Sequence, residues 1–308
     1  MKIKKCIIGF FVISTAIILL YITCTVYIHK KTDQLVDAIR KNDTEKVIEI
    51  VSNCNSCVNQ LNSLFPELSV MLDCSVLYPL QIACETGNYE IVQILIDYGA
   101  DVNCIDPTIH STPLIMALSS MNQNRFEIAN LLIESGADVI VNADDHGENA
   151  LAAATCLSLN ANDLEKEASL VMFDKIVDVY IANDIDIKEV SCNCYNVYFF
   201  ATKESNLEVV KYLLENDIFE VDETSKDGGT ALMQAVRSNK ETIVQFLMEQ
   251  GANPYIVDDS GNSAHDYAIQ NDNQEIIELL IRDDNISDRK ISHQEAETYI
   301  GSYSRRRI

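Results

Sequence analysis

Residues 78–103 read YPLQIACETGNYEIVQILIDYGADVN, and this stretch decides the fold. A short opening segment ends at Ala83, where a small side chain lets neighbouring helices approach closely. The segment that follows is rich in Ile and Leu, and Leu95 lies in the apolar stripe that a helix buries against a neighbour. Gly99 then ends the segment where a helix needs a left-handed residue. The stretch therefore predicts two helices joined by a turn.

The same pattern recurs along the chain. The alanines that close the openings are followed by apolar second segments, and they are spaced by 45, 34, 37, 47, 34 and 33 residues. They are Ala38, Ala83, Ala117, Ala154, Ala201, Ala235 and Ala268. Six openings in register are very unlikely to arise by chance in an unrelated helical protein. We therefore expect about seven copies of one helix–turn–helix unit, with the first and last acting as caps.

This pattern resembles the ankyrin repeat, which opens TPLHLA, ends GADVN and has a period of ~33 residues. The resemblance covers residues 33–284 and is weakest in the first and fourth copies. It implies an all-α ankyrin-repeat solenoid that recognises a protein partner through its concave face, built from hairpin tips and first helices. The two long spacings place insertions near residues 54–77 and 157–169.

Residues at the predicted helix starts and ends support these boundaries. Thr112 is suited to cap a first helix, and Pro113 to occupy the position after it. Gly99, Gly136 and Gly251 should end second helices in the left-handed conformation, as should Asp217 in the fifth copy. In the fourth copy we expect Asn183 to take this role.

The N-terminus predicts a membrane anchor. Residues 1–5 form a basic tail, and residues 6–28 contain no charge. As a helix, 23 residues span ~34 Å, enough for a bilayer core of ~30 Å. A cleaved signal peptide would have a shorter apolar run and a small-residue cleavage site, and a lipoprotein would need a better motif before Cys24. We therefore expect one uncleaved transmembrane helix.

The orientation of this anchor is a separate question. Three lysines precede the apolar run, which favours a cytoplasmic N-terminus and an extracytoplasmic body, periplasmic if the organism is Gram-negative. Several basic residues also follow the run, so the two flanks do not separate cleanly by charge. At the other end of the chain, residues 285–308 are expected to form a C-terminal tail.

The charge of the body indicates its partners. Residues 32–308 contain 18 lysines and arginines against 47 aspartates and glutamates, a net charge of −29. Such a surface repels nucleic acid and attracts basic protein surfaces, although it also serves solubility. The resemblance places the predicted hairpin tips, with a nearby exposed aromatic, in the partner-binding face. The candidates are Asp106, Asp144, Asp145, His146, Phe199, Lys226, Asp227, Asp258 and Asp259.

Phe199 belongs to an aromatic group that is unusual for a repeat opening. Tyr198 and Phe200 occupy positions that point into the core, whereas Phe199 stands where the ankyrin pattern has a polar His. Core packing and a binding hot spot are the alternatives for Phe199.

Ten cysteines raise a question of redox state. Cys84 and Cys156 follow the small residue of a first helix and are expected to be buried thiols. The candidates for disulfide bonds, if the body lies outside the reducing cytosol, are Cys54, Cys57, Cys74, Cys192 and Cys194. Free thiols are the alternative. A four-thiolate metal site is disfavoured because Cys192 and Cys194 have one residue between them, not two to four.

The chain lacks every motif expected of an enzyme. It contains no G-x-S-x-G, P-loop, H-E-x-x-H or dinucleotide-binding glycine pattern, and its five histidines lack ligand spacing. We expect no catalysis, cofactor or metal. The predicted function is a membrane-anchored protein–protein interaction module, with an inhibitor or immunity-type role as its sharper form. A membrane-associated redox or haem-related protective role, using the cysteines, is the alternative.

Overall fold

The computed structural model describes residues 23–60, 77–107, 110–141, 149–157, 163–192 and 195–281. It divides into two compact units, Met1–Phe200 and Ala201–Ile308, with the boundary inside helix α10 (Val197–Glu204). Within the described ranges every regular element is a helix, and the hairpins contain only isolated bridges. The predicted all-α repeat fold is therefore confirmed.

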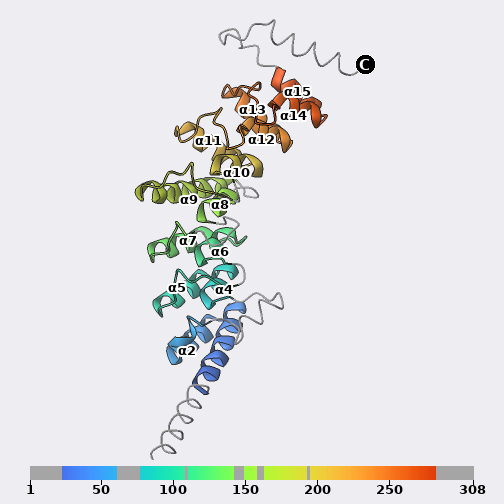
Figure 1. Ribbon diagram of the computed structural model, residues 1–308. Coiled ribbons are helices and arrows are strands. Elements are labelled where there is room, and N and C mark those ends of the chain that lie inside the picture. The colour runs from blue at the N-terminus through green and yellow to red at the C-terminus, as the bar shows by residue number, and fades with distance from the viewer. Residues whose placement is uncertain are drawn as a thin grey trace, which may run out of the picture. The chain divides into compact units, whose positions relative to one another are not determined.

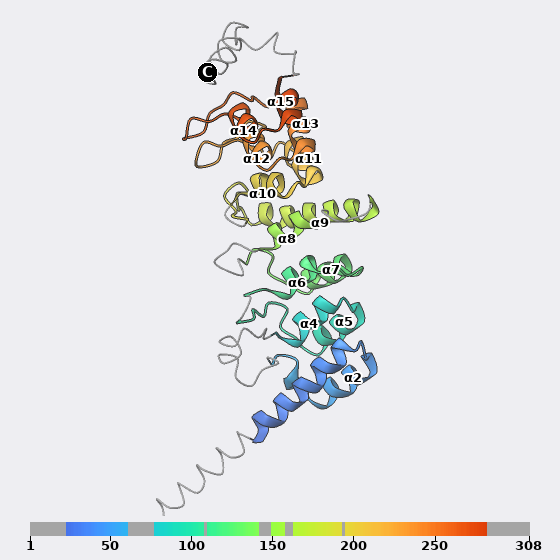
Figure 2. The same ribbon diagram turned by 90° about the vertical axis from the view of Figure 1, so that its right-hand side faces the viewer.

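The first unit is a stack of helix pairs (Figures 1 and 2). Residues 23–40 are helical and precede α2 and a 3-10 turn, η1. The inner helices α4, α6 and α8 pack on one another in that order, and an outer helix accompanies each of them. The bounds are α2 Thr44–Asn53, η1 Asn55–Cys57, α4 Pro79–Thr86, α5 Tyr89–Asp97, α6 Pro113–Ser119, α7 Arg125–Glu134, α8 Ala150–Cys156 and α9 Asp163–Ala182.

The second unit repeats the same arrangement. It contains α11 (Leu207–Glu215), α12 (Ala231–Arg237), α13 (Glu241–Glu249), α14 (Ala264–Gln270) and α15 (Gln274–Ile281). Inner helix α12 packs against inner helix α14, and outer helix α13 against outer helix α15. We call the helix pairs α4–α5, α6–α7, α8–α9, α12–α13 and α14–α15 repeats 2, 3, 4, 6 and 7.

The inner helices begin as the sequence predicts. Thr112, Asn149, Thr230 and Ser263 each accept a hydrogen bond from the backbone N–H of the third helical residue. This bond satisfies one of the N–H groups that a helix start leaves without a partner. Pro113 follows Thr112 as the first helical residue, as predicted.

The outer helices also end as predicted, with one correction. Gly99, Gly136 and Gly251 have φ of +85°, +90° and +81°, and Asp217 has φ of +54°. In repeat 4 the left-handed residue is Asp184 and not Asn183. The reason is the register of the last hydrogen bond, in which the Tyr180 carbonyl accepts the Ile185 N–H at 3.1 Å. The carbonyls of Leu95, Leu132 and Leu247 accept the N–H five residues later in the same way, and the left-handed residue always comes just before that N–H.

The core lies between successive helix pairs. The small residue of each inner helix is buried, and so is the leucine of the accompanying outer helix where one is present. Examples are Ala117 with Leu132 in repeat 3 and Ala235 with Leu247 in repeat 6, all at 0% exposure. Each repeat therefore buries its apolar face on its neighbour, as expected of a repeat stack.

The predicted transmembrane helix, residues 6–28, lies mainly outside the described residues, so it stays a prediction. None of the described helices is both long enough and apolar enough to cross a bilayer. The C-terminal tail, residues 285–308, also lies outside the described ranges, as do residues 61–76 of the first insertion.

Candidate partner-binding surface

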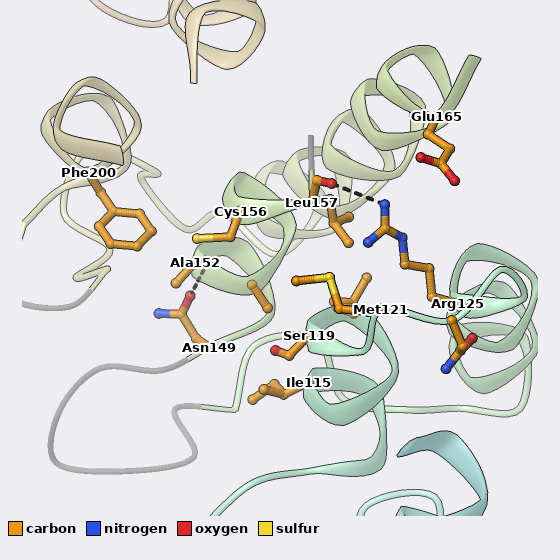
Figure 3. A pocket seen from close by; sticks show the side chains of 13 residues that line it. Ile115, Ser119, Met121, Arg125, Asn149, Ala152, Cys156, Leu157, Glu165 and Phe200 are labelled. Atoms are coloured by element: carbon orange, nitrogen blue, oxygen red, sulfur yellow. Dashed lines mark hydrogen bonds between the residues drawn. The ribbon is translucent and has the colours of Figure 1, made fainter. Parts of the chain in front are cut away.

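A groove of about 330 Å³ opens on repeats 3 and 4 of the first unit (Figure 3). Its floor is mainly apolar and its rim carries polar and charged side chains. The lining residues are Ile115, Leu118, Ser119, Met121, Asn122, Arg125, Asn149, Ala152, Ala153, Cys156, Leu157, Glu165 and Phe200. We call this the insertion groove, for the reason that follows.

Two insertions build the groove. In repeats 2 and 6, one residue near the end of the outer helix has a carbonyl that accepts the N–H five positions later. This residue lies 12 positions after the alanine of the inner helix, as Leu95 does after Ala83. The interval is 15 positions in repeat 3 and 26 in repeat 4, where Ala154 precedes Tyr180. The extra residues of repeat 3 lie in the loop 120–124, and those of repeat 4 lie in the connection after α8 and in the longer α9. Met121 lines the groove from the first insertion and Glu165 from the second.

Arg125 ties the two insertions together. Its guanidinium donates to the carbonyl of Leu157 at 3.1 Å and to the carbonyl of Ser120 at 3.4 Å. The guanidinium also lies 4.9 Å from the centroid of the Phe126 ring. Arg125 is only 9% exposed, so this cation is held by carbonyls inside the protein. Figure 3 shows the side chain crossing from α7 to the end of α8.

One cysteine in the wall of the groove differs from the sequence prediction. Cys84 is buried as expected, but Cys156 is exposed and lines the groove. Cys84 directly follows Ala83, whereas Cys156 comes two positions after Ala154, and the buried Thr155 takes the position that corresponds to Cys84. The nearby Cys192 is buried, which raises the pKa of its thiol to about 12.

The second unit presents two hairpin tips, residues 225–229 and 258–262. In the first, Ser225 Oγ donates to Asp227 Oδ1, and the Ser225 N–H donates to the Gly229 carbonyl at 2.8 Å. In the second, Asp258 Oδ1 accepts the N–H groups of Ser260 and Asn262 at 2.9 and 3.0 Å. These bonds fix the backbone of both tips.

The two tips contact each other and the inner helices beneath them. The Asp259 N–H donates to the Asp227 carbonyl at 3.0 Å. Tyr267 of α14 donates its hydroxyl hydrogen bond to Asp258 Oδ2, and the Arg237 guanidinium lies 5.2 Å from the Tyr267 ring centroid. The tips are therefore ordered by their own side chains and by α12 and α14.

Hydrogen bonding favours the charged form of two tip carboxylates. The bond from Ser225 lowers the pKa of Asp227, and the bond from Tyr267 lowers the pKa of Asp258. The same bond raises the pKa of the Tyr267 hydroxyl, because ionisation would remove the proton that it donates. At neutral pH both carboxylates are ionised, and in the first tip the cation of Lys226 lies next to Asp227 in the sequence.

The predicted binding residues fall into three groups. Lys226, Asp227 and Asp259 are exposed on the tips of the second unit, and Asp258 is partly exposed. Asp144, Asp145 and His146 lie outside the described residues. Asp106 and Phe199 are not available to a partner.

Asp106 and Phe199 are therefore corrections. Asp106 is 0% exposed and accepts the Ser111 N–H at 3.0 Å, so its carboxylate holds the turn before α6. Phe199 is 4% exposed and its ring packs 5.7 Å from that of Tyr198. Of the two alternatives for Phe199, core packing is confirmed, because α10 buries its first four residues.

The candidate cysteines show no disulfide bond within the described ranges. Cys54 and Cys57 are free and buried, as is Cys192, whereas Cys74 and Cys194 lie outside the described residues. The Cys57 thiol donates to the Cys54 carbonyl at 2.8 Å, and burial raises its pKa to about 12. No group of ligand residues suited to a metal ion occurs in the described part of the chain. The disulfide hypothesis for these five residues stays a prediction.

Sequence reasoning missed several surface residues that the structure brings forward. Met121 is 80% exposed at the groove, and Arg237 and Tyr267 support the tips. Met121 had a detectable signal, since it lies in the three residues by which repeat 3 exceeds the regular interval. Arg237 and Tyr267 had none, because their roles depend on contact with loops from another part of the sequence.

Stacked helix pairs with ordered hairpin tips define the chain as a helical repeat protein, and the comparisons specify its family. A family model described as ankyrin repeats (three copies) matches residues 35–143, 168–258 and 198–290. The chain belongs to the ankyrin repeat family. Ankyrin repeats act as protein–protein interaction modules, which is the broad function of this chain.

Individual relatives share the repeats at modest identity. YahD, an ankyrin repeat protein of Escherichia coli (strain K12), is 26% identical over 210 residues, covering 65% of this chain and 92% of YahD. Ankyrin repeat and SAM domain-containing protein 6 of Danio rerio is 29% identical over 56% of this chain, which spans only 21% of that protein. The crystal structure of the human ASB11 ankyrin repeat domain matches with a TM-score of 0.57 at 21% identity, covering 80% of this chain and 96% of that one. This last likeness concerns the fold alone.

Proposed function

We propose that this chain is a membrane-anchored, non-catalytic binding protein whose partner presents a basic surface. The observation that carries the proposal is the exposure of two carboxylates, Asp227 and Asp259, on the ordered hairpin tips of the second unit. Asp227 and Asp259 are exposed on a backbone that side-chain hydrogen bonds already fix. A partner would therefore meet charges in place without the loss of loop entropy on binding.

The charge of the whole chain supports the same partner chemistry. The net charge is −24, and on the two tips the three aspartates Asp227, Asp258 and Asp259 outnumber the one lysine, Lys226. Such a field steers a basic surface toward the protein and raises the association rate, with less effect on dissociation. A stoichiometric inhibitor or immunity-type role, in which the acidic surface blocks a basic secreted protein, is the specific form we propose.

The membrane anchor and the orientation of the body belong to the same proposal. Residues 6–28 form an uncharged run preceded by three lysines, which favours a single-pass anchor with the repeats outside the cytoplasm. Proteolysis of intact cells, followed by immunoblotting for the repeats, tests the orientation. Digestion of the repeats is expected, with an internal cytoplasmic protein intact as control. Full protection of the repeats in intact cells, with digestion after lysis, would reject it.

The redox alternative has less support among the described residues. Catalytic and redox-sensing cysteines need a thiolate at neutral pH. Burial instead raises the pKa values of Cys57, Cys104 and Cys192 to about 12. The lack of enzyme motifs in the sequence supports a binding role over catalysis.

Association kinetics test the basic-partner proposal. The full chain in detergent is used to recover a partner from native membranes, and the association rate is then measured at rising salt concentration. The double variant Asp227→Asn/Asp259→Asn should associate several-fold more slowly. The matched control Glu249→Gln/Glu275→Gln removes the same charge from exposed positions on outer helices. Equal effects of the two double variants, or a rate that salt does not change, would contradict the proposal.

A further inference from the structure

Two cysteines lie at the two ends of the turn that follows α2. Cys54 is the residue that ends α2, and Cys57 is the last residue of η1. The Cys57 N–H donates to the Cys54 carbonyl at 3.2 Å, and a turn closed in this way keeps its outer Cα atoms within about 7 Å. Disulfide bonds join Cα atoms that are roughly 4.4–6.8 Å apart. The backbone of this turn is therefore compatible with a bond between the two cysteines.

The two side chains also interact. The Cys57 Sγ lies 2.8 Å from the Cys54 carbonyl oxygen, so its thiol is directed back across the turn. Burial is the main cause that raises the pKa of the Cys57 thiol, and the nearby Cys54, with a side-chain hydrogen bond, adds to it. Cys54 is 9% exposed and Cys57 0%, so both thiols are buried in the same place. They can be joined without movement of any other part of the chain.

Cys192, a third candidate for disulfide bonding, is placed differently. Its Sγ lies 3.9 Å from Asn149 Oδ1 in repeat 4. Repeats 2 and 3 separate repeat 4 from α2, because α4, α6 and α8 pack on one another in that order. Cys192 is therefore out of reach of Cys54 and Cys57, which have each other as neighbours.

The turn that holds the two cysteines connects two parts of the first unit. On one side the buried Thr32, in the helix before α2, donates to the Cys57 carbonyl at 3.5 Å. On the other side Asn59 donates to the Gly99 carbonyl and accepts the Asp101 N–H, both at 2.8 Å. The turn therefore links the helix nearest the predicted anchor to the end of repeat 2. A terminal repeat has one neighbour, so it opens more easily than an inner repeat unless something else holds it.

We propose that Cys54 and Cys57 are joined by a disulfide bond in the membrane-anchored protein, and that this bond fastens the first helices of the chain to the repeats that follow. The proposal rests on the proposed function, specifically on an extracytoplasmic body, because disulfide bonds persist outside the reducing cytosol. Two S–H bonds break and one S–S bond forms. Two protons pass to solvent, and the two electrons reduce the disulfide of a thiol oxidoreductase to its dithiol.

The bond is structural and not catalytic. The attacking species in disulfide exchange is a thiolate, which burial disfavours in the folded turn. The bond therefore forms during folding, before the turn is buried. Burial then keeps reductants away from it.

Peptide mapping tests the pairing. The full chain in native membranes is treated with N-ethylmaleimide under acid-quenched conditions, digested with a protease that cuts after glutamate, and analysed by mass spectrometry. Cuts after Glu49 and Glu67 release residues 50–67, which contain Cys54 and Cys57 and no other cysteine. This peptide should be lighter than its dithiol form by two hydrogen atoms. It should take up the reagent only after reduction.

Refolding of the purified, reduced chain in detergent and a glutathione redox buffer separates this proposal from the proposed function. The same bond should form there, whatever compartment the cell uses. Free thiols after refolding, or residues 50–67 linked to the peptide with Cys74, would overturn the pairing and leave the acidic binding surface standing. A bond that forms on refolding but is absent from native membranes would overturn the disulfide in the cell and count against the extracytoplasmic body as well.

Hydrogen exchange resolved by peptide tests the role of the bond. In the wild type, reduction should speed the exchange of residues 44–60 about tenfold, because a short cross-linked loop restricts the opened state by roughly that factor. Cys57→Ala should exchange fast with or without reductant. Cys104→Ala is the matched control, since Cys104 is also a buried free thiol, and this variant should keep the response to reductant. The wild-type measurement needs no variant to fold, and exchange that reduction does not change would reject the fastening role.

Discussion

Repeats 4 and 6 start in the same way and then diverge. Asn149 and Thr230 each cap a seven-residue inner helix through a bond to the N–H of the third residue. After α12, three residues lead to the nine-residue α13, whereas six residues separate α8 from the 20-residue α9. The two repeats thus share the cap and the inner helix at their start and the left-handed residue after the outer helix at their end, and they differ in the connection and in the length of the outer helix.

The two regions also hold their loops differently. In the second unit, tip residues bond to one another, and Asp258 accepts the hydrogen bond of the Tyr267 hydroxyl at the surface. In repeats 3 and 4, the buried Arg125 crosses to the carbonyl of Leu157 and ties the loops from within. A buried cation is costly to place and costly to lose, whereas exposed contacts contribute little. Substitutions in the insertion-bearing repeats should therefore cost more than matched ones in the regular repeats.

Glycine substitution should show the largest difference. Gly87, before α5, has φ of +75°, and a Cβ there would overlap Cβ and Cγ of Asn122 in the insertion of repeat 3. Gly261, before α14, has φ of +77° but nothing within 4 Å of the same position. Gly87→Ala should lower the free energy of unfolding by about 2–4 kcal/mol, from backbone strain plus overpacking. Gly261→Ala should cost only the strain, about 1 kcal/mol. Urea unfolding followed by circular dichroism measures both; equal losses would mean that Asn122 moves aside freely.

The two arginines provide the next comparison. Arg125→Ala leaves two carbonyls without their donor and opens a cavity, so a loss of about 2–3 kcal/mol is expected. Arg237→Ala removes a partly solvated contact with Tyr267 and should cost about 0.5–1 kcal/mol. Hydrogen exchange resolved by peptide should show the loosening of Arg125→Ala in repeats 3 and 4. Faster exchange confined to other repeats would contradict the role of Arg125 as a tie.

The sequence predicts some of these structural features and misses others. The repeat spacing, the caps at Thr112 and Ser263 and the glycine ends follow from local chemistry, so the sequence alone predicts them. The insertion near residues 157–169 was also visible, but its consequence was not, because Met121 and Glu165 line one groove only after two repeats have stacked. Burial of Asp106 was missed for a related reason. Aspartate in a hairpin usually signals exposure, whereas here its carboxylate accepts the Ser111 N–H inside the turn.

Removal of one tyrosine hydroxyl group in each region tests the same comparison. Tyr180 of α9 is 1% exposed, and its hydroxyl donates to the Val139 carbonyl at 3.3 Å. Tyr180→Phe should cost about 1 kcal/mol, because the carbonyl loses its donor in a buried place. Tyr267→Phe removes a partly exposed bond to Asp258, which water replaces, and should cost about half as much. Thermal unfolding of both variants beside the wild type checks the order, and a larger loss for Tyr267→Phe would reverse our view of the two regions.

The smallest expected effect is the change with pH in the stability that Asp258 contributes. The folded pKa of Asp258 is lowered chiefly by the Tyr267 hydroxyl, so its stabilising contribution is present above the unfolded pKa of about 3.9 and is lost as pH falls through the folded value. Urea midpoints of the wild type and Asp258→Asn should therefore differ most near pH 7 and converge below pH 4. The difference is small because the carboxylate is largely solvated. Because Asn keeps the acceptor oxygen for the Ser260 and Asn262 N–H groups, convergence would isolate the charge from the shape of the tip. A gap between the two midpoints that does not narrow as the pH is lowered below 4 would mean that Asp258 stabilises the tip by geometry alone.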